Sequence, residues 1–521
     1  MKDMQVASMR TSAAPEPQAL PVLQASAATL WNKALAYHQA GWLSEAEELY
    51  GKLLQQCPEH FDGLHMLGVI AHQRGEHAAA LRRIDHALTI DPGAAQAHNN
   101  RGVVLAELKR LEEALASYNT AIALAPGYVD AIVNRANALR ELNRFEQALA
   151  SCDRAIALRP DLAEAFNSRG SALQNLMRMD EALASFDRAV AIDPDYAEGY
   201  WYRALCRLRL GRYSEGWVDY EWRWRTDQTD SERRNFSQPL WFGDGDIAGK
   251  TLLLHPEQGF GDTVMAVRYI PKVIERGARV VLETPSALEP LLAGIEGIAQ
   301  VVTKGSPLPA FDLHCPLLSL PLAFGTTLDA IPAQVPYLSV PANYFEKWQQ
   351  RLPGFGKIRV GICWAGNPDH KRDHQRSIAL DLMLPLLSRS DVSFISLQKP
   401  LRERDVAILR NNPQIAHFDN DIENFADTAA IISMLDLVIS VDTSVVHLAG
   451  ALGRPVWILL QFMPDWRWLL DRNDSPWYPT ARLFRQSRSD DWDGVVDAAT
   501  SELSRFVASN ATQFPDHVRH D

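Results

Sequence analysis

The sequence predicts a multidomain chain in which an all-α solenoid of helix pairs is followed by an α/β part with two lobes. Three observations support this prediction. The first half repeats at a step of 34 residues, the second half alternates between β-rich runs and helical stretches, and a proline-rich passage from Pro332 to Pro341 divides that second half in two. A chain of 521 residues is also too long for a single hydrophobic core.

The composition is that of a globular protein, with 47% hydrophobic and 22% charged residues. A net charge of −12 argues against general affinity for nucleic acid or anionic membranes. The 5 cysteines are scattered, form no CxxC pair and predict a reducing compartment without a zinc site. No apolar run approaches the ~20 residues that cross a bilayer, and the first ~25 residues lack the apolar core of a signal peptide. We therefore expect a cytoplasmic protein with no transmembrane segment and no nucleic-acid partner.

Shifts in composition predict the domain boundaries. The first residues combine Pro15, Pro17 and Pro21 with Ser, Ala and Gln, which predicts disorder. The full predicted order is a disordered segment at 1–26, helical repeats at 27–226, a linker at 227–249, an N-terminal lobe at 250–345, a C-terminal lobe at 346–510 and a tail at 511–521.

Three kinds of residue recur in register in the first half. Small residues at two positions let paired helices approach closely, a larger residue fills the gap between them, and a proline ends the second helix because it cannot donate the helical hydrogen bond. The members are Ala34, Gly68, Gly102, Ala136, Gly170 and Ala204; Ala46, Ala80, Ala114, Ala148 and Ala182; Tyr50, Ile84, Tyr118, Cys152 and Phe186; and Pro58, Pro92, Pro126, Pro160 and Pro194. The pattern resembles the tetratricopeptide repeat, in about six units, and the resemblance implies a protein or peptide partner.

The sixth unit departs from this pattern. Gln228 stands where the proline is due, and the run "YEWRWR" from Tyr220 to Arg225 replaces the usual ending. A terminal repeat must cover an otherwise exposed face, so we expect a cap or a joint to the next domain.

Asparagines recur on the first helices of the repeats, which line the concave surface of such a solenoid. Asn100 and Asn134 are in register, and Asn167 lies near the next equivalent position. A side-chain amide both donates and accepts hydrogen bonds, so this ladder is a candidate site for a peptide backbone. The alternative is a solvated helix face, with neighbouring arginines bonding between repeats. The arginines in register are Arg101, Arg135, Arg169 and Arg203.

The period changes after about Gly249. The runs "KTLLLH" and "ARVVLE" predict strands on either side of a helix that ends at Gly277, and the runs "KIRVGICWAG", "VSFISLQ", "LDLVISV" and "RPVWILL" predict four more. Strand–helix alternation predicts parallel sheets with helices on both faces. The two series therefore predict two Rossmann-like lobes with a cleft between them.

The stretch "HPEQGFGDTV" follows the first of these strands and contains Gly259, Gly261 and Asp262. Three interpretations are open: Asp262 caps the next helix, Asp262 accepts a proton from a substrate hydroxyl, or the glycines form a dinucleotide turn with Glu283 on the ribose. The third glycine of a dinucleotide fingerprint would fall at Val264, and a carboxylate beside a pyrophosphate is unfavourable.

A second turn follows the buried run "LDLVISV". Asp442, Thr443 and Ser444 open a helix that carries His447 one turn later. Unbonded amides at a helix start, together with two hydroxyls, are suited to a diphosphate. Asp442 is a candidate cap or sugar ligand, and His447 is either a phosphate ligand or a structural partner of the neighbouring strand end.

The glycine loop with Asp262, "GICWAGNPDHKRDHQRSIAL", "ISLQK" and "DTSVVHLAGALGRPV" occur in this order and resemble glycosyltransferase family 9, the heptosyltransferase-like group of GT-B enzymes. The resemblance covers about residues 250–505 and implies an α/β GT-B domain with Asp262 as catalytic base. The donor-binding residues that it implies are Gly259, Gly261, Asp442, Thr443, Ser444 and His447. Repeats followed by this domain also resemble bacterial tetratricopeptide-glycosyltransferase fusions and, loosely, the O-linked N-acetylglucosaminyltransferases.

Heptosyltransferases place a lysine on the donor phosphates, whereas this chain offers the basic residues of 371–376. We choose Arg376, because a guanidinium binds phosphate oxygens bidentately; its alternative role is an ion pair in a helix-entry loop. Lys399, at the end of a strand, is a further donor-binding candidate. The other candidates in the basic stretch are Lys371, Arg372 and His374.

Two further motifs receive a structural interpretation. Asp244-Gly245-Asp246 resembles the metal-binding DxD of other glycosyltransferases but lies before the first strand, so we assign no metal site. An aromatic cluster near the end of the C-terminal lobe is expected to pack that lobe, with stacking on a sugar or base as the alternative. Its members are Trp466, Trp468, Trp477 and Tyr478.

The sequence thus predicts a tetratricopeptide solenoid fused to an inverting, metal-independent glycosyltransferase. The enzyme would move a sugar from a nucleotide-diphosphate donor, its co-substrate, to an acceptor hydroxyl on a protein that the repeats recruit, without a cofactor. The alternative is a non-catalytic adaptor whose GT-B domain only binds nucleotide sugars. A dinucleotide-dependent enzyme is the third candidate.

Overall fold

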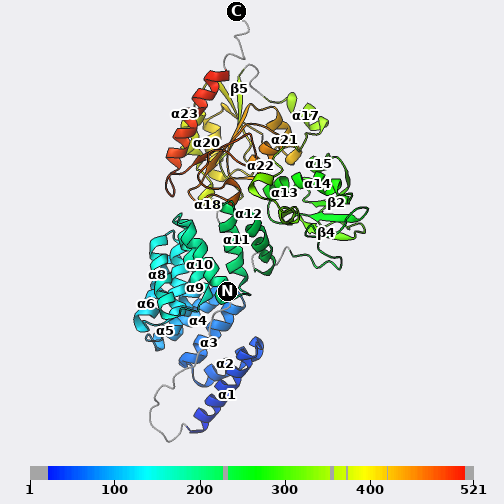
Figure 1. Cartoon of the computed structure of the whole chain (residues 1–521). Helices are drawn as coiled ribbons and strands as arrows, with labels where there is room; N and C mark the ends of the chain where they lie inside the picture. Colours follow the sequence, from blue (N-terminus) through cyan, green and yellow to red (C-terminus); the bar gives the residue numbers. More distant parts are fainter. Residues whose placement is uncertain (1–20, 227–232, 353–356, 371–372, 419, 511–521) are drawn as a thin grey trace, which may run out of the picture. The chain divides into compact units, whose positions relative to one another are not determined.

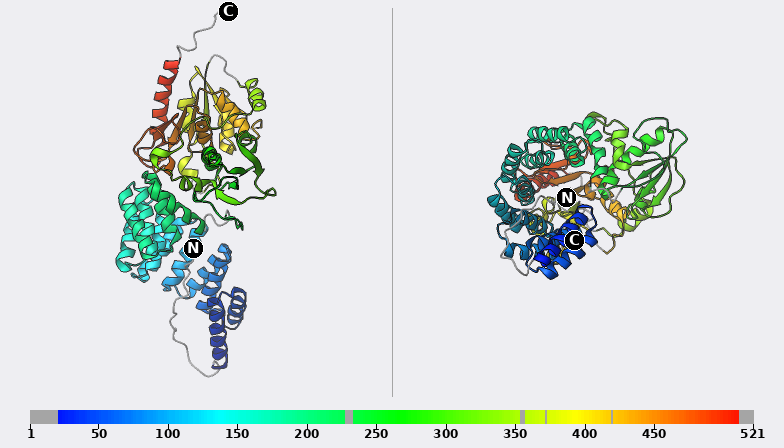
Figure 2. Two further views of the ribbon diagram at one scale, coloured as in Figure 1. Left: turned by 45° about the vertical axis from the view of Figure 1, so that its right-hand side comes forward. Right: turned by 90° about the horizontal axis from the view of Figure 1, so that it is seen from below.

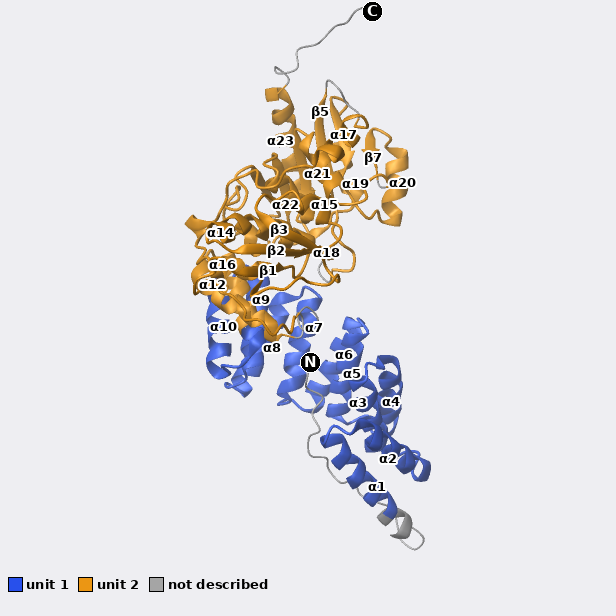
Figure 3. Cartoon of the chain, turned by 90° about the vertical axis from the view of Figure 1, so that its right-hand side faces the viewer, with its two compact units in different colours: residues 1–199 blue, residues 200–521 orange. Residues whose placement is uncertain are grey.

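The computed structural model describes residues 21–226, 233–352, 357–370, 373–418 and 420–510. Contacts divide the chain into two compact units, residues 1–199 and 200–521, which Figure 3 shows in separate colours. The expected disordered segment and the C-terminal tail fall on ranges outside the described residues, apart from 21–26. There the first helix already begins at Pro21. Within the described ranges, no helix combines the length and the apolar character that crossing a bilayer requires.

Unit 1 is all-α, and each odd-numbered helix packs on the even-numbered helix that follows it (Figures 1 and 2). The second helices of the pairs end two residues before the repeating prolines, as the sequence predicts. The helices are α1 (Pro21–Gln39), α2 (Leu43–Gln56), α3 (Phe61–Gln73), α4 (His77–Ile90), α5 (Ala95–Glu107), α6 (Leu111–Leu124), α7 (Val129–Glu141), α8 (Phe145–Leu158), α9 (Ala163–Asn175) and α10 (Met179–Ile192).

The helix pairs are held by the small and large residues that recur in the sequence. A β-carbon on Gly102 would lie 2.5 Å from the ring of Tyr118, and one on Gly170 would lie 2.5 Å from the ring of Phe186. Such distances leave no room for any side chain, so glycine is needed there for close approach of the two helices. The predicted roles of the small and large positions are therefore confirmed.

The sixth repeat has a different ending and a different partner. Its helices are α11 (Ala197–Arg209) and α12 (Tyr213–Tyr220), and α12 continues into the 3-10 helix η1 (Glu221–Arg225). The boundary between the units falls inside α11, and α12 packs against α16 of unit 2. Trp217, 1% exposed, donates from Nε1 to the carbonyl of Thr326 at 2.9 Å. Helix α12 and most of α11 therefore belong to the second unit and its core.

The N-terminal lobe of unit 2 is a four-stranded parallel sheet in the order β3-β2-β1-β4. Leu252, Leu254, Val280 and Leu282 on one face join the large core under the lobe's helices. The elements are β1 (Thr251–His255), α13 (Phe260–Ala266), η3 (Val267–Tyr269), α14 (Ile270–Glu275), β2 (Arg279–Thr284), α15 (Glu289–Leu292), β3 (Ile298–Thr303), β4 (Leu313–Pro316), η4 (Leu317–Ser319), α16 (Leu320–Ala323) and η5 (Leu328–Ala330).

The C-terminal lobe is a six-stranded parallel sheet in the order β10-β9-β8-β5-β6-β7. Strands β8 and β9 are buried throughout, as the continuous apolar runs in the sequence predict. The elements are α17 (Ala342–Gln349), β5 (Ile358–Cys363), α18 (Asp373–Arg376), α19 (Leu380–Leu387), β6 (Val392–Ser396), α20 (Glu403–Asn411), β7 (Ile415–His417), α21 (Phe425–Ser433), β8 (Leu437–Val441), α22 (Ser444–Ala451), β9 (Val456–Leu460), η6 (Trp466–Trp468), β10 (Ala481–Arg485) and α23 (Trp492–Asn510).

All six strands predicted from their runs are present in these two α/β lobes, but two expectations need correction. The single helix expected before Gly277 is interrupted by the 3-10 turn η3 and restarts as α14, with Pro271 in its first turn. Proline lacks the amide that would continue the helical bonds. The lobe boundary expected at 346 lies inside α17, which packs on α21 of the C-terminal lobe through Trp348, whose Nε1 donates to Asp427 at 2.8 Å.

Candidate functional site

The turn after β1 is held by Asp262 itself. Gly259 is the residue before α13, and its amide donates to Oδ2 of Asp262 at 2.9 Å. The carboxylate thus caps α13, as one of the three interpretations predicted. Its side chain remains 19% exposed. The cap uses Oδ2, and the proton-accepting role of the carboxylate stays a prediction.

The other carboxylate oxygen of Asp262 contacts an arginine that the sequence analysis did not single out. Nη2 of Arg467, from η6 of the C-terminal lobe, pairs with Oδ1 of Asp262. Nη1 of Arg467 donates to Asp465 at 2.8 Å, and the guanidinium lies over the Trp466 ring, 4.2 Å from its centroid. Arg467 lies inside the aromatic run "MPDWRWLL", where a buried cation among tryptophans was the available signal.

At Gly261 the N-terminal lobe lies directly against helix α22 of the C-terminal lobe. A β-carbon on Gly261 would lie 2.6 Å from Cδ2 of His447 and 3.4 Å from Cα of Ser444. Helix α13 therefore packs directly on α22, and Figure 1 shows the two helices next to each other. The space that a pyrophosphate would need above Gly261 in a dinucleotide turn is filled by His447. The donor contacts assigned to Gly259 and Gly261 stay predictions.

His447 is buried between aromatic rings. Its Nδ1 lies 2.9 Å from the hydroxyl of Tyr478, and its ring stacks on Trp468 with centroids 5.5 Å apart. Burial, with nearby arginines, lowers the pKa of His447 well below its usual value, so the ring is neutral at pH 7. The structural bond expected for His447 goes to Tyr478 rather than to a neighbouring strand end. Contact with a phosphate stays a prediction.

The start of α22 has the geometry expected of a helix that follows a buried strand. Strand β8 ends at Val441, and Thr443 is the N-cap, accepting a hydrogen bond from the amide of Val445 at 3.3 Å. The cap is thus Thr443 and not Asp442. Burial and the nearby carboxylate of Asp465 raise the pKa of Asp442 to about 6. Ser444, half-buried, is the first helical residue.

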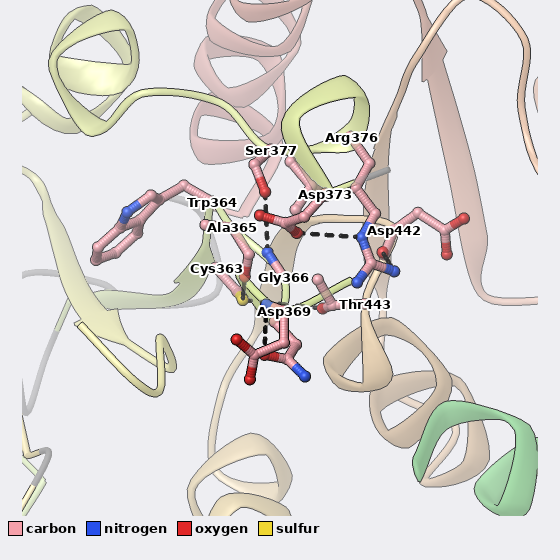
Figure 4. Close-up of polar contacts among 12 residues, drawn as sticks. Cys363, Trp364, Ala365, Gly366, Asp369, Asp373, Arg376, Ser377, Asp442 and Thr443 are labelled. Atoms are coloured by element: carbon pink, nitrogen blue, oxygen red, sulfur yellow. Dashed lines mark hydrogen bonds and ion pairs between the residues drawn. The ribbon is translucent and has the colours of Figure 1, made fainter. Parts of the chain in front are cut away.

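Arg376, the last residue of α18, reaches the start of α22 (Figure 4). Its Nη1 donates to the carbonyl of Asp442 at 3.2 Å, and its Nε donates to Asp373 at 3.3 Å. A β-carbon on Gly366 would lie 2.5 Å from Nη2, so this glycine lets the guanidinium lie against the backbone. The structure therefore places Arg376 beside the predicted diphosphate site and also in the ion pair named as its alternative role. Lys371 and Arg372 lie outside the described residues.

The residues that follow β6 hold the turn after β5 in place. Gln398, 1% exposed, accepts hydrogen bonds on Oε1 from the amides of Trp364 at 3.1 Å and Ala365 at 2.9 Å. Lys399 donates from Nζ to the carbonyl of Ile422, in the loop before α21. Gln398 therefore positions the backbone that carries Gly366, and donor binding by Lys399 stays a prediction.

Residues of the sixth repeat bond to the glycine turn that follows β1. Arg223, from the "YEWRWR" run, is fully buried and bonds Glu257 through Nε at 3.1 Å and Nη2 at 2.9 Å. Oε1 of Glu257 also accepts from the amide of Leu318 at 3.0 Å. Nε2 of Gln258 donates to the hydroxyl of Tyr220 at 3.1 Å. Residues of η1 and α12 thus fix the turn that presents Asp262.

The remaining motifs have structural partners. Asp246 accepts a hydrogen bond from the amide of Ala248 at 3.0 Å, as in an ordinary turn, and no group of three metal-ligating side chains occurs among the described residues. Glu283, 1% exposed, pairs with Arg234 at 3.1 Å. The aromatic cluster packs the lobe, as expected, because its four members are at most 1% exposed. They are Trp466, Trp468, Trp477 and Tyr478.

The asparagines assigned to peptide binding are engaged inside unit 1. The amide of Asn100, 1% exposed, lies 2.9 Å from Nε2 of His65, whose pKa is lowered to about 4 by burial. Nδ2 of Asn134 donates to Asn99 at 3.0 Å, and Nδ2 of Asn167 donates to the hydroxyl of Tyr196 at 3.3 Å. A peptide would have to replace these bonds, so the role of these asparagines stays a prediction.

The arginines in register stabilise the helix pairs. Arg101 donates to Asp85 at 2.6 Å and Ser117 at 2.7 Å, and Arg169 donates to Asp153 at 2.7 Å and Ser185 at 2.8 Å. This is the bonding between helices that the sequence analysis named as the alternative to a peptide-binding surface.

Comparison with known proteins identifies the repeats. Two family models of the tetratricopeptide repeat match the chain, one at residues 65–129, 133–197 and 178–217 and the other at residues 27–60. Protein FlbA of Caulobacter vibrioides is 26% identical over 333 residues, a match that covers 59% of this chain and 55% of FlbA. The chain thus spans about half the length of this curated relative.

Three of the solved structures that resemble part of the chain are the following. MamA is 20% identical with a TM-score of 0.30, over 34% of this chain and 96% of MamA. A tetratricopeptide repeat protein from Parabacteroides merdae is 21% identical with a TM-score of 0.35, over 40% of this chain and 81% of that protein. PilW, a type IV pilus biogenesis factor, is 20% identical with a TM-score of 0.36, over 40% of this chain and 95% of PilW. From the family models, the N-terminal part of the chain consists of tetratricopeptide repeats, which indicate protein partners, and a domain with parallel sheets follows it.

Proposed function

We propose that the second unit is a GT-B glycosyltransferase that moves a sugar from a nucleotide-diphosphate donor to an acceptor hydroxyl. One observation carries this proposal. The Asp262 carboxylate, from the N-terminal lobe, stands at the contact with α22 of the C-terminal lobe, where Gly261 lies against Ser444. A proton acceptor and a helix start suited to a diphosphate are thereby brought to one place from two lobes.

The proposed reaction is a single displacement. Asp262 takes the proton of the acceptor hydroxyl as its oxygen forms a bond to the anomeric carbon of the donor sugar. The bond from that carbon to the diphosphate breaks, and its electron pair leaves with the nucleoside diphosphate. Amides at Thr443 and Ser444 and the guanidinium of Arg376 stabilise the leaving charge, so no metal is required and the configuration inverts.

The acceptor hydroxyl in this proposal belongs to a protein that the repeats recruit. Tetratricopeptide repeats indicate protein partners, and the sixth repeat contacts the turn that carries Asp262 through Glu257 and Gln258. The proposed base is therefore supported by residues of the last repeat, which follows the repeats proposed to recruit the partner.

A donor screen tests the proposal first. Thermal unfolding of the full chain is measured with UDP-, GDP-, ADP- and dTDP-sugars, because a ligand of the folded state raises the midpoint. We expect one nucleotide to raise the midpoint, and the same donor to be consumed slowly to free nucleoside diphosphate. Binding without any consumption or transfer, even with protein acceptors present, would instead support the non-catalytic adaptor.

Asp262→Asn tests the chemistry. The proposed base is removed while the side chain keeps its shape, so we expect the rate of transfer to fall by about 100-fold or more, without a loss of donor affinity. Asp427→Asn is the matched control, because Asp427 caps α21 from the same helical position and pairs with Lys347 at 2.7 Å. Transfer by Asp262→Asn at the rate of this control would remove Asp262 from the mechanism.

A further inference from the structure

Arg467 is a buried cation shared by two carboxylates at the contact between the lobes. Its side chain is 8% exposed. Its guanidinium forms ion pairs with Asp262 of the N-terminal lobe and with Asp465, two residues earlier in the chain. Nε lies 3.2 Å from the sulfur of Met265, a weak acceptor. The strong bonds of Arg467 therefore all go to the two carboxylates.

A diphosphate at the start of α22 would compete with nearby carboxylates for the cations there. In the described part of the chain, the carboxylates of Asp262, Asp442 and Asp465 and the guanidinium groups of Arg376 and Arg467 gather there. Burial, and after it the repulsion from Asp465, raises the pKa of Asp442 to about 6, while Arg376 and Arg467 act in the opposite direction. Donor phosphates need a cation that is not already neutralised.

The pairing with Arg467 also limits the proposed base. A carboxylate that accepts a hydrogen bond from a guanidinium is stabilised in its charged form and gains less from accepting a proton. With Arg467 in place, Asp262 is therefore a poor acceptor for a hydroxyl proton. A movement of the Arg467 guanidinium from Asp262 toward the diphosphate would give the phosphates a cation and would also leave Asp262 able to accept a proton.

We propose that Arg467 is a ligand of the donor diphosphate, which draws the guanidinium away from Asp262 when it binds. The inference rests on the proposed function, because it names a further residue of the same site. A diphosphate carries more charge than one carboxylate and accepts the guanidinium bidentately, so it competes well for Arg467. Asp465 keeps the other side of the guanidinium in place. Donor binding thus frees Asp262, and the base becomes active only when a donor is present.

The test compares two ligands of the nucleotide that the donor screen identifies: its nucleoside diphosphate and its nucleoside, titrated by calorimetry. The ratio of their dissociation constants isolates the contribution of the phosphates. Arg467→Met should lower the affinity for the diphosphate by about 10-fold or more and leave the nucleoside within about twofold. An equal loss for both ligands, or no loss for either, overturns the proposal.

Asp465→Asn should raise, rather than lower, the affinity for the diphosphate. The asparagine keeps the side-chain oxygen that caps η6. Oδ1 of Asp465 accepts from the Arg467 amide at 3.1 Å, a bond that an amide oxygen can also accept. Removing this charge leaves more of the guanidinium for phosphate, so the affinity for the diphosphate should rise about threefold or more, with the nucleoside unchanged. Because the change is small, this variant remains informative if Arg467→Met fails to fold.

Arg485→Lys is the control for a general loosening of the segment around η6, which carries Arg467. Arg485 donates to the carbonyls of Trp468 at 2.7 Å and Leu469 at 3.2 Å, next to Arg467, and no carboxylate bond is involved. The ratio of the two dissociation constants should stay at the wild-type value. If Arg485→Lys changed this ratio as much as Arg467→Met does, the effect would come from loosening of the segment around η6, and the inference would be overturned. Failure of wild type to bind any nucleotide would overturn the proposed function itself.

Discussion

At the scale of single residues, Gly261 has a packing role that the sequence did not predict, beside the donor contact that stays a prediction. It has no side chain because His447 and Ser444 occupy the space where one would stand. His447 cannot retreat, since it is stacked on Trp468 and bonded to Tyr478. The glycine therefore brings Asp262 close to α22, and it is required for packing rather than for backbone conformation.

Gly261→Ala should consequently destabilise the second unit. The added methyl would lie 2.6 Å from His447, and overpacking of this kind costs about 1–3 kcal/mol. Urea unfolding followed by tryptophan fluorescence is a suitable measurement, because only Trp31 and Trp42 of the 14 tryptophans lie in unit 1. Gly259→Ala is the control, since its methyl meets only an oxygen of Asp262 at 3.2 Å. Equal effects of the two changes would contradict the packing role of Gly261.

Single residues of the site were predictable where the backbone dictates their place. Thr443, Ser444 and Arg376 come together because a buried strand must end near the start of the following helix, and the carboxyl ends of parallel strands share one edge. Arg467 was missed because its partner Asp262 is 205 positions away in the chain. No local pattern encodes such a pairing. The same holds for Arg223 and Glu257.

At the scale of elements, η1 replaces the last turns of a repeat helix and supports the glycine turn. Its Arg223 has no exposed surface and bonds Glu257 and Glu221. A buried carboxylate that loses its cation keeps the cost of desolvation without compensation.

Arg223→Met should therefore destabilise the second unit by about 3–5 kcal/mol. Adding Glu257→Gln removes the charge left behind, so the double variant should be more stable than Arg223→Met alone. The free energies of unfolding of the wild type, both single variants and the double variant form a cycle that measures this coupling. Additive losses would show that the two side chains act independently.

The elements that were predictable are those with a strong local period. The 34-residue step and the apolar runs gave the repeats and the central strands of both sheets. The strands β3, β4, β7 and β10 lack a continuous apolar run because they lie toward or at the sheet edges, where one side is less buried. The break at η3 was missed because the apolar spacing continues through it, although Pro271 marked the restart.

At the scale of the whole molecule, the division between the two units does not follow the repeat pattern. The family model reaches residue 217, whereas the second unit already begins at residue 200. Tyr213, Trp217 and Tyr220 of the last repeat are at most 2% exposed and join the hydrophobic core of the lobes. The sixth repeat is part of the α/β domain in its packing.

Two truncated chains test this division. A fragment of residues 197–521 retains α11, α12 and η1 and should unfold cooperatively with native tryptophan fluorescence. A fragment of residues 226–521 lacks these aromatic side chains, each of which buries about 150–250 Å² in a core, and should aggregate or unfold without a cooperative transition. Cooperative unfolding of both fragments would show that the lobes do not need the last repeat.

Because the dividing line falls upstream of the residues that support the turn at Asp262, the repeats ahead of it can be exchanged without altering those supports. Hybrid chains that keep residues 197–521 and carry foreign repeats ahead of them would retain the turn at Asp262 and the start of α22 while presenting a different surface to protein partners. Recombination at α11 would thus leave every residue assigned to the proposed donor site in place.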